Sequence, residues 1–568
     1  MRRILRGLIA VVLAAAVLPA AGAIPASAAG SAAAAARAEP EPRPMGSCRV
    51  KATDFTYTSF DGTPIDTTLF VPNTATARHP EPAIMVSHGF PGWHRGEGDI
   101  ADHRMLASHC YVVLAWTERG LGNSGGEIEL LDPDFEVRDA RGLVTWLAGR
   151  PEVQKDRRGD PRLGMFGGSY AGGIQTLLAT HDPRVDVITP QVTWNDLRYA
   201  LYPNGAIKQG WINLLFASGT ASGYCGPNFT APECNPVPPG WTPEAVQHVL
   251  VSTAFNGDPT GEVLAWLAKR SPATYAKRWR IPTLLVQGIG DTLFTLNEAI
   301  RNYRIVRGNG APAKLIFFSG GHGQPDDPGE RRHINERVLQ WLAKYLRGKR
   351  STPTGPPVEV AAQWMPGQDH FVGMKALPPT SSVQFELAAG GGLVPPGTAP
   401  GVAGIPIVNS VAPTSYSEVP NFQSSVPLDP TDVGEPATAT SFATPAMTRA
   451  LTVIGQPAVH FTLTSTTGEA IVFWKVYDLA PDGTYELVHR LVTPIRVLGE
   501  GQWPATAPIT EPVDIRLGLQ SIVHRFEVGH RLVLTVATTD TAHYASRLPG
   551  VYQIGAGAGS KMLLPAVT

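Results

Sequence analysis

This chain of 568 residues lacks an excess of charge of either sign, because 47 lysine and arginine side chains nearly balance 48 aspartate and glutamate side chains. Without a surplus of basic residues, nucleic acid is not expected as a partner. Cysteine is scarce, at four residues, and no Cys-x-x-Cys pair occurs, so the spacing does not indicate a zinc site. Neither a metal nor an organic cofactor is implied.

The apolar run near the N-terminus, Leu8 to Leu18, is too short for a membrane span, which needs about 20 residues. It follows three arginines and precedes Ala26-Ser27-Ala28, which offers small residues for cleavage. This pattern predicts a signal peptide over residues 1–28. We therefore expect a secreted, extracellular protein with no stable membrane span after cleavage, and a retained N-terminal anchor is the alternative.

If the protein is exported, its four cysteines are expected to form disulfides, because disulfides form in oxidising compartments. Cys225 and Cys234 flank a short segment containing glycine and proline, which favours a local disulfide between them. That pairing would leave Cys48 to pair with Cys110. Three pairings are possible in principle, and four free buried thiols are the alternative reading.

The composition and the hydrophobic pattern change several times along the chain. Residues 29–47 are alanine-rich and then proline-rich, which predicts a flexible linker. Residues 48–350 alternate continuous apolar runs with helical patterns, as a parallel sheet covered on both faces requires. These runs are 83–87, 111–115, 162–166, 282–286 and 314–318. The predicted class is α/β with a doubly wound sheet.

Two further segments depart from this alternation. Residues 195–279, which are rich in proline and tryptophan, are interpreted as a cap inserted over the sheet, where substrate specificity would be determined. Residues 351–357 form a proline-rich linker. Residues 358–568 show short alternating runs and turn clusters, which predict an all-β sandwich of the jelly-roll type.

The most informative motif is Phe166-Gly167-Gly168-Ser169-Tyr170-Ala171-Gly172-Gly173, between a strand-like run and a helical one. A nucleophile elbow needs this context, because its serine sits on a strained turn from strand to helix and small neighbours let the two elements approach. The N–H of Tyr170 would then lie at the helix N-terminus, where it can stabilise an oxyanion. Taken alone, the motif is also compatible with an ordinary turn.

An acid and a histidine should follow such a serine, each just past a later strand. Asp291 and His322 satisfy this order, and both lie in glycine-containing loops after apolar runs. Ser169 would attack, His322 would transfer the proton, and Asp291 would orient the imidazole. A second oxyanion donor is expected from the loop at 87–93, from the N–H of Phe90 or else of Gly89.

Arg119 to Gly126 reads Arg-Gly-x-Gly-x-Ser-x-Gly, and Gly167 to Gly172 reads Gly-x-Ser-Tyr-x-Gly. Together these motifs resemble the Xaa-Pro dipeptidyl-peptidase and cocaine esterase family of serine hydrolases, and residues 472–483 resemble its C-terminal jelly-roll domain. The resemblance implies an α/β-hydrolase domain with Ser169, Asp291 and His322 as the triad and Tyr170 as the backbone oxyanion donor. Family members often supply a tyrosine hydroxyl where this chain has Phe90.

The predicted function is hydrolysis of an ester or amide through an acyl-serine intermediate. Small acyl esters and peptides that begin with Xaa-Pro remain alternative substrates. A different class is a non-catalytic protein with a vestigial hydrolase fold, in which tryptophans of the β domain would bind carbohydrate. These tryptophans are Trp364, Trp474 and Trp503.

Overall fold

The computed structural model describes residues 45–225, 240–248, 259–325, 327–365, 370–377, 381–398, 403–412, 414–415, 417, 437–499 and 507–567. The predicted signal peptide and nearly all of the 29–47 linker lie outside these residues. Within the described part, no helix is both long and apolar enough to cross a membrane.

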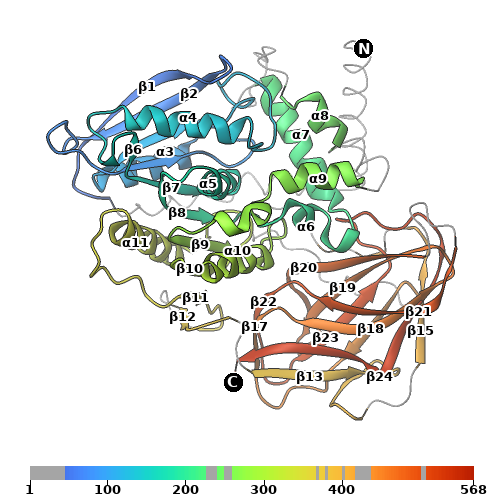
Figure 1. Ribbon diagram of the computed structural model, residues 1–568. Helices are drawn as coiled ribbons and strands as arrows, with labels where there is room; N and C mark the ends of the chain where they lie inside the picture. The colour runs from blue at the N-terminus through green and yellow to red at the C-terminus, as the bar shows by residue number, and fades with distance from the viewer. Residues whose placement is uncertain are drawn as a thin grey trace, which may run out of the picture.

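A ten-stranded sheet organises the N-terminal half of the molecule (Figure 1), in the order β1-β2-β4-β3-β7-β8-β9-β10-β11-β12. The strands from β4 to β11 in this order run parallel, whereas β1, β2 and β12 pair antiparallel at the two ends. The strands are β1 (Val50–Thr58), β2 (Pro64–Pro72), β3 (Ala83–Val86), β4 (Val112–Trp116), β7 (Leu163–Gly168), β8 (Val185–Gln191), β9 (Thr283–Gly288), β10 (Ala313–Phe318), β11 (Val358–Ala361) and β12 (Phe371–Met374). A small hairpin, β5 (Lys155–Arg157) and β6 (Asp160–Pro161), lies apart.

Helices cover both faces of this sheet, which explains why central strands such as β3 and β4 are apolar and buried along their whole length. Ala83 and Met85 of β3 belong to the hydrophobic core on one face, whereas Ile84 and Val86 belong to the core on the other. The first face is covered by α4 (Glu136–Ala148), α5 (Tyr170–His181) and α10 (Leu296–Gly308), and the second by α3 (Glu97–Ser108) and α11 (Pro328–Tyr345).

The segment expected to form a cap lies between β8 and β9, and its described residues are mostly helical (Figure 1). It contains α6 (Leu197–Leu201), η1 (Pro203–Gly205), α7 (Gln209–Cys225), α8 (Pro243–Val246), α9 (Gly261–Lys269) and η3 (Pro272–Arg278). Its tryptophans Trp211, Trp241 and Trp266 are buried and join the core of the large sheet domain. The described cap is therefore packed onto the sheet domain rather than standing away from it.

The C-terminal part is an all-β domain of two antiparallel sheets around its own hydrophobic core. One sheet contains β13 (Ser381–Leu387), β14 (Leu393–Val394), β15 (Ala403–Asn409), β17 (Leu451–Gly455), β18 (Ala458–Ser465), β21 (Ile509–Gly518), β22 (Ile522–Phe526) and β24 (Gly550–Val567). The other contains β16 (Ala439–Ala443), β19 (Glu469–Leu479), β20 (Tyr485–Leu498) and β23 (Arg531–Ala537). An α/β-hydrolase sheet with a cap, followed by an all-β domain, confirms the predicted fold class.

The predicted division at residue 358 differs from the strand pairing. Val358–Ala361 forms β11, which pairs in parallel with β10, and β12 pairs antiparallel with β11. Both strands extend the large sheet and do not join the all-β domain, whose strands begin with β13 at Ser381. Covering the β10 edge explains this arrangement, since an exposed edge of unpaired backbone groups invites association with other chains.

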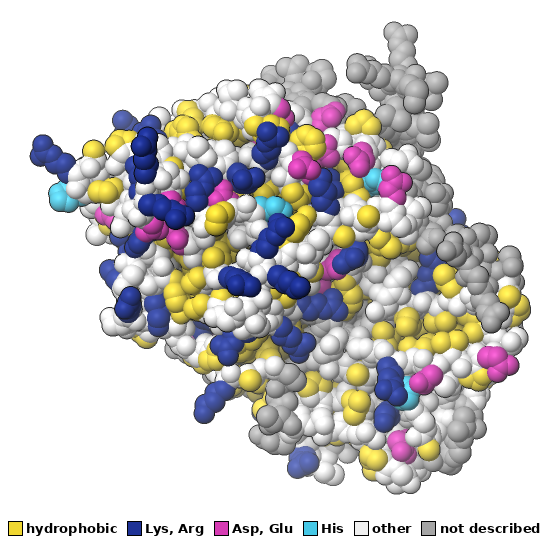
Figure 2. Space-filling model, viewed as in Figure 1, with side chains coloured by type: hydrophobic (Ala, Val, Ile, Leu, Met, Phe, Trp, Pro, Cys, Tyr) yellow, Lys and Arg dark blue, Asp and Glu magenta, His cyan; other side chains and the backbone are white. Residues whose placement is uncertain are grey.

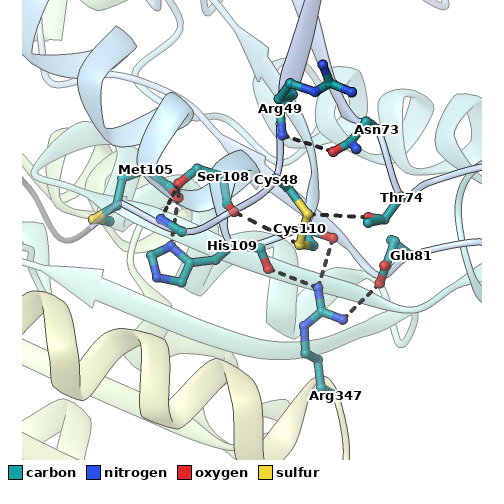
Figure 3. The surroundings of a disulfide bond; sticks show 11 residues. Cys48, Arg49, Asn73, Thr74, Glu81, Met105, Ser108, His109, Cys110 and Arg347 are labelled. Atoms are coloured by element: carbon teal, nitrogen blue, oxygen red, sulfur yellow. Dashed lines mark hydrogen bonds and ion pairs between the residues drawn. A yellow bond between two sulfur atoms is a disulfide. The ribbon is translucent and has the colours of Figure 1, made fainter.

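A disulfide joins Cys48 to Cys110 at the start of the described chain, with Cα atoms 5.5 Å apart (Figure 3). Arg347, just after α11, donates to the carbonyl of Cys110 at 2.8 Å and pairs with Glu81 at 2.8 Å. The disulfide and this arginine together attach the N-terminal strand to the sheet. The side chain of Cys225 and all of Cys234 lie outside the described residues, as therefore does their predicted pairing.

Charge is mixed over the surface that Figure 2 shows. Lysine and arginine side chains are spread across the large sheet domain with aspartate and glutamate among them, and charged side chains are fewer on the all-β domain. The near balance of the two signs in the sequence is thus also visible on this face of the molecule.

Candidate active site

Ser169 lies at the sharp turn between β7, which ends at Gly168, and α5, which begins at Tyr170. Its backbone φ of 56° and ψ of −118° are unusual for a residue with a side chain. Gly167 has a φ of 137°, and a Cβ there would lie 2.7 Å from the Cβ of Ala171. This strained turn with obligatory small neighbours is the geometry of a nucleophile elbow.

Two glycines at the start of α5 let the helix approach the segment that follows β8. A Cβ at Gly172 would lie 2.7 Å from the Cβ of Thr193, and a Cβ at Gly173 would overlap the indole ring of Trp194. The Thr193 hydroxyl donates a hydrogen bond to the carbonyl of Ser169 at 3.0 Å. The glycines of the sequence motif therefore have a packing role that determines where Ser169 is presented.

Ser169, His322 and Asp291 form one continuous chain of hydrogen bonds. The Oγ of Ser169 is 2.9 Å from Nε2 of His322, and Nδ1 of His322 is 2.8 Å from Oδ2 of Asp291. His322 is 5% exposed and Asp291 is fully buried. The structure thus brings together three residues that the sequence analysis selected from loops 153 and 31 residues apart.

The carboxylate of Asp291 is held by the protein on both oxygens. Oδ1 accepts hydrogen bonds from the backbone N–H groups of Leu293 and Phe294, at 3.0 and 2.9 Å. Oδ2 accepts from Nε2 of Gln287 at 2.8 Å, in addition to the imidazole. The sequence analysis missed Gln287, although a polar side chain within the apolar strand β9 was a signal that could have identified it.

The loop after β3 lies beside Ser169. A Cβ built on Gly89 would be 4.0 Å from the Cβ of Ser169. The ring of Phe90 contacts the rings of Tyr170 and Trp241, with centroids 5.3 and 5.4 Å apart. The two backbone amides expected to bind an oxyanion, those of Tyr170 and Phe90, therefore belong to segments that meet at Ser169.

His88, in the same loop, forms hydrogen bonds that hold the loop in place and is not bonded to Ser169. Its Nε2 accepts a hydrogen bond from the N–H of Glu118 at 3.1 Å, so the ring proton belongs on Nδ1, which donates to the carbonyl of Gly89 at 2.9 Å. Burial lowers the pKa of His88 to about 4, which keeps the ring neutral. His88 thus connects the Gly89–Phe90 segment to the loop after β4.

Glu118 is buried beneath this loop and accepts a hydrogen bond from the Ser87 hydroxyl at 2.9 Å. Burial, followed by the charge of Glu136, raises its pKa to about 8. Because the folded state then binds a proton that the unfolded state releases near pH 4.5, this group makes folding less favourable as the pH rises from about 4.5 to about 8.

Glu118→Gln is therefore expected to raise the melting temperature relative to the parent protein by more at pH 8 than at pH 5, because glutamine keeps the acceptor for Ser87 without the titration. Thermal unfolding at the two pH values measures the difference. Thr176→Val, at a buried side chain that does not titrate, is the control and should shift the melting temperature equally at the two pH values. An equal shift for Glu118→Gln at both pH values would contradict the expectation.

Aromatic side chains surround the histidine. The rings of Trp211 and Phe294 meet the His322 ring edge-on, with centroids 5.9 and 5.2 Å away. Phe216, in α7 of the cap, stacks on Trp241 with ring centroids 5.9 Å apart. Trp241 in turn contacts Phe90. Buried aromatic side chains thus pack around His322 and Phe90, and the cap contributes Trp211, Phe216 and Trp241.

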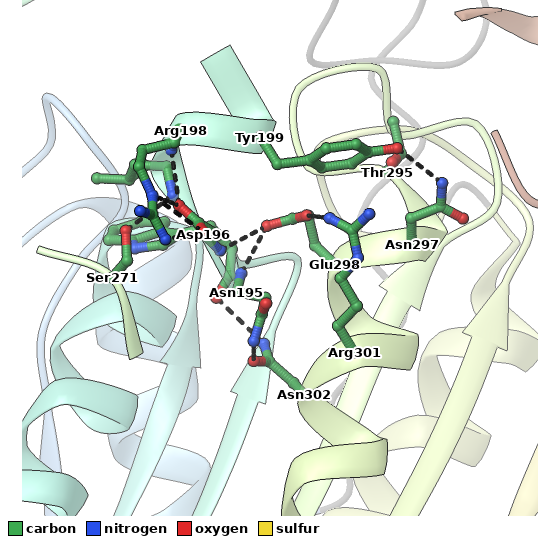
Figure 4. Close-up of polar contacts among 12 residues, drawn as sticks. Asn195, Asp196, Arg198, Tyr199, Ser271, Thr295, Asn297, Glu298, Arg301 and Asn302 are labelled. Carbon is green, nitrogen blue, oxygen red and sulfur yellow. Dashed lines mark hydrogen bonds and ion pairs between the residues drawn. The ribbon is translucent and has the colours of Figure 1, made fainter. Parts of the chain in front are cut away.

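A polar network connects the segment after β8 to helix α10 (Figure 4). The buried carboxylate of Glu298 accepts hydrogen bonds from the N–H groups of Asn195 and Asp196 at 2.7 and 2.9 Å, and it pairs with Arg301 at 3.2 Å. The side chains of Asn195 and Asn302 are bonded at 2.8 Å. Since the segment also packs on the elbow and α10 follows the Asp291 loop, this network ties the serine and acid loops together.

A metal centre is not indicated in the described residues, where no group of three or more His, Cys, Asp or Glu side chains could hold an ion. The arrangement of a buried acid, an imidazole and an activated hydroxyl is suited to nucleophilic attack on a carbonyl carbon.

Two family models match the chain. Residues 61–324 match the X-Pro dipeptidyl-peptidase (S15 family), and residues 355–554 match the X-Pro dipeptidyl-peptidase C-terminal non-catalytic domain. A curated relative, dipeptidyl aminopeptidase BIII of Pseudoxanthomonas mexicana, is 25% identical over 311 residues, which are 52% of this chain and 38% of the relative. The match thus spans well under half of that relative's length.

Solved structures share the fold over nearly the whole chain. An α-amino acid ester hydrolase has a TM-score of 0.70 with 18% identity, covering 92% of this chain and 97% of its own. An aminopeptidase from a marine sediment Thaumarchaeota archaeon has a TM-score of 0.69 with 15% identity, covering 91% and 96%. The resemblance inferred from the sequence motifs is confirmed.

Proposed function

The chain belongs to the X-Pro dipeptidyl-peptidase (S15) family of serine hydrolases, and from this premise we propose that it hydrolyses esters or amides through an acyl-enzyme on Ser169. The observation that carries the proposal is the unbroken chain of hydrogen bonds from Ser169 through His322 to the buried Asp291. In this proposal these three residues are the catalytic triad.

The mechanism follows from these contacts. The Oγ of Ser169 attacks the carbonyl carbon while its proton passes to Nε2 of His322, and Asp291 holds Nδ1–H and stabilises the imidazolium. Collapse of the tetrahedral intermediate breaks the bond to the leaving alcohol or amine, which takes the proton from His322. Water then attacks the acyl-enzyme and gives one proton to His322. Collapse of the second tetrahedral intermediate breaks the bond to Oγ of Ser169, which takes that proton back from His322 as the carboxylic acid leaves.

The negative charge on the carbonyl oxygen needs two donors. In this proposal they are the N–H of Tyr170, at the N-terminus of α5, and the N–H of Phe90 in the loop beside Ser169. The side chain of Phe90 has no hydroxyl, so it contributes an apolar wall against Tyr170 and Trp241 and only its backbone can donate.

Two substrate classes are proposed. The aromatic side chains that pack around His322 and Phe90 make the surroundings of Ser169 largely apolar, which supports small, uncharged acyl esters as substrates. The family supports peptides that begin with Xaa-Pro, and the dipeptidyl aminopeptidase relative supports a peptide substrate more generally. Comparing rates on a short nitrophenyl ester and on a Gly-Pro anilide distinguishes them, and cleavage of neither would contradict both.

The acyl-serine proposal is tested by treating the protein with a fluorophosphonate and mapping the adduct by peptide mass spectrometry. One adduct is expected, on Ser169, because the probe reacts with an activated serine hydroxyl and not with ordinary ones. Heat-unfolded protein is the control and should not be labelled. Well-folded protein without an adduct would overturn the proposal in favour of a vestigial, non-catalytic fold.

The alternative of a carbohydrate-binding β domain receives little support from the described tryptophans. Trp474 is 1% exposed and packs on Phe461 at 4.7 Å between ring centroids, so it belongs to the core. Trp364 is partly buried against the core of the large domain. Trp503 lies outside the described residues.

We also propose that the protein is exported. The proposal is supported by the arginines, apolar run and small residues of the first 28 positions, together with a disulfide between Cys48 and Cys110. It places the hydrolase where small esters or peptides outside the cell are its substrates.

A further inference from the structure

The loop that carries Asp291, residues 289–295, and the start of α10 that follows it are held by parts of the molecule that the proposed chemistry does not use. The orientation of the Asp291 carboxylate depends on this loop, because the N–H groups of Leu293 and Phe294 hold Oδ1. Any group that locates the backbone at 292–294 therefore also locates the acid relative to His322.

Lys208 is such a group. It stands directly before helix α7 of the cap and is 3% exposed. Its Nζ donates to the carbonyls of Thr292 and Leu293, at 2.6 and 3.1 Å. Three residues further on, Nε1 of Trp211 donates to the hydroxyl of Thr292 at 3.1 Å. A buried ammonium is costly unless its hydrogen bonds are satisfied, so this lysine strongly favours one position of the loop.

The C-terminal domain holds the backbone on both sides of Lys208. The N–H of Tyr544 donates to the carbonyl of Ile207 at 2.9 Å, and the N–H of Gly210 donates to the carbonyl of Ala542 at 3.0 Å. These bonds come from residues 540–544, within the connection 538–549 between β23 and β24, and we call them the loop 540–544. One backbone hydrogen bond on each side of Lys208 restricts its backbone. The side chain of Lys208 can therefore point in only a narrow range of directions.

The loop 540–544 is itself anchored by charge. Asp540 and Lys475 are both fully buried and form an ion pair at 3.0 Å. Asp540 also accepts hydrogen bonds from Ser417 at 2.8 Å and from Nδ1 of His543 at 2.8 Å. Removing one partner from a buried, hydrogen-bonded pair is strongly destabilising, so this cluster keeps the loop in one conformation.

A second contact holds the other end of the acid loop. Oε1 of Gln520, in the turn between β21 and β22, accepts hydrogen bonds from the Thr295 hydroxyl at 2.7 Å and from Nδ2 of Asn297 at 3.1 Å. The N–H of Ser521 donates to Oδ1 of Asn297 at 3.1 Å. The acid loop and the start of α10 are thus bonded at 292–293 through Lys208 and at 295–297 through the C-terminal domain directly.

We propose that Lys208 and Gln520 are positioning residues for Asp291, and that the C-terminal domain, through its loops 519–521 and 540–544, holds the catalytic acid in register with His322. The inference rests on the triad mechanism proposed above. It assigns a part in catalysis to a domain whose family description is non-catalytic.

The test measures the second-order rate of labelling by a fluorophosphonate, which needs no knowledge of the natural substrate. Lys208→Met and Gln520→Leu are each expected to slow labelling of Ser169 by about 10- to 100-fold, the loss typical of a misplacement of about 1 Å in a reacting group. In the Asp291→Asn background the same changes should slow labelling by less than about twofold, because the residue through which they act has gone.

Two control variants separate positioning from general damage. Lys314→Met removes another buried ammonium, which donates to the carbonyl of Pro356 in the large sheet domain. Thr444→Val removes a buried hydroxyl that accepts a hydrogen bond from the N–H of Leu532 within the C-terminal domain, away from the loops 519–521 and 540–544. Both should leave the labelling rate of folded protein within about twofold of the parent, even where the melting temperature falls.

If Lys208→Met does not fold, Gln520→Leu alone decides the test. Labelling rates within twofold of the parent, or equal losses in the parent and in the Asp291→Asn background, would overturn the inference while leaving the proposed function intact. Failure of the parent protein to form an adduct on Ser169 would overturn the proposed function, and this inference with it.

Discussion

Ser169→Ala is expected to lower kcat on a nitrophenyl ester by about a million-fold, the loss seen when the nucleophile of a serine hydrolase is removed. The hydroxyl is the only atom of the triad that forms the bond to the acyl carbon, so neither His322 nor Asp291 can compensate. The activity that remains should be the small rate supported by the oxyanion donors and by substrate binding.

Initial rates with purified protein measure this loss, together with the fluorophosphonate adduct, which should disappear. The fold should survive, because the change removes one hydrogen bond to His322, at a cost of about 1 kcal/mol. Ser441→Ala is a matched control, since it removes a hydroxyl bonded to Thr535 within the all-β domain and should leave the rate unchanged. A variant at position 169 that kept more than about 1% of parental activity would contradict the triad.

The meeting of the three residues of the proposed triad could be predicted because each follows an apolar strand closely in the sequence. Ser169 comes directly after β7, and Asp291 and His322 come three and four residues after the ends of β9 and β10. In a parallel sheet those strand ends lie along one edge, so order and spacing alone were sufficient to bring the three side chains together. His88 was also interpreted correctly as a brace, because it precedes the serine and lies in the loop after β3.

Other features depend on contacts that no local pattern encodes. Val358–Ala361 reads as a short alternating strand in either domain, and only the edge of β10 decides where it pairs. Lys208 bonds across 84 positions to Thr292, and Gln520 across 225 positions to Thr295. Their own neighbours along the sequence carry no trace of these partners, so the attachment of the acid loop to the C-terminal domain became visible only in three dimensions.

Asp291→Asn is expected to lower kcat by about 10⁴-fold with a much smaller effect on KM, by reversing the tautomer of His322. The site around Asp291 consists entirely of donors: two backbone N–H groups face Oδ1, and the side chain of Gln287 and the imidazole face Oδ2. An asparagine must place its single oxygen toward the two backbone donors. Its amide then faces His322 as a donor.

Nδ1 of His322 must then accept a hydrogen bond from the asparagine amide, so the ring proton moves to Nε2. Nε2 then donates toward Ser169 and can no longer accept the hydroxyl proton, so the nucleophile is not activated even though every heavy atom keeps its place. Steady-state kinetics measure the separate effects on kcat and KM. Asp327→Asn is the matched control, because Asp327 caps helix α11 and asparagine caps equally well. A loss below about tenfold in Asp291→Asn would show that the tautomer of His322 does not depend on Asp291.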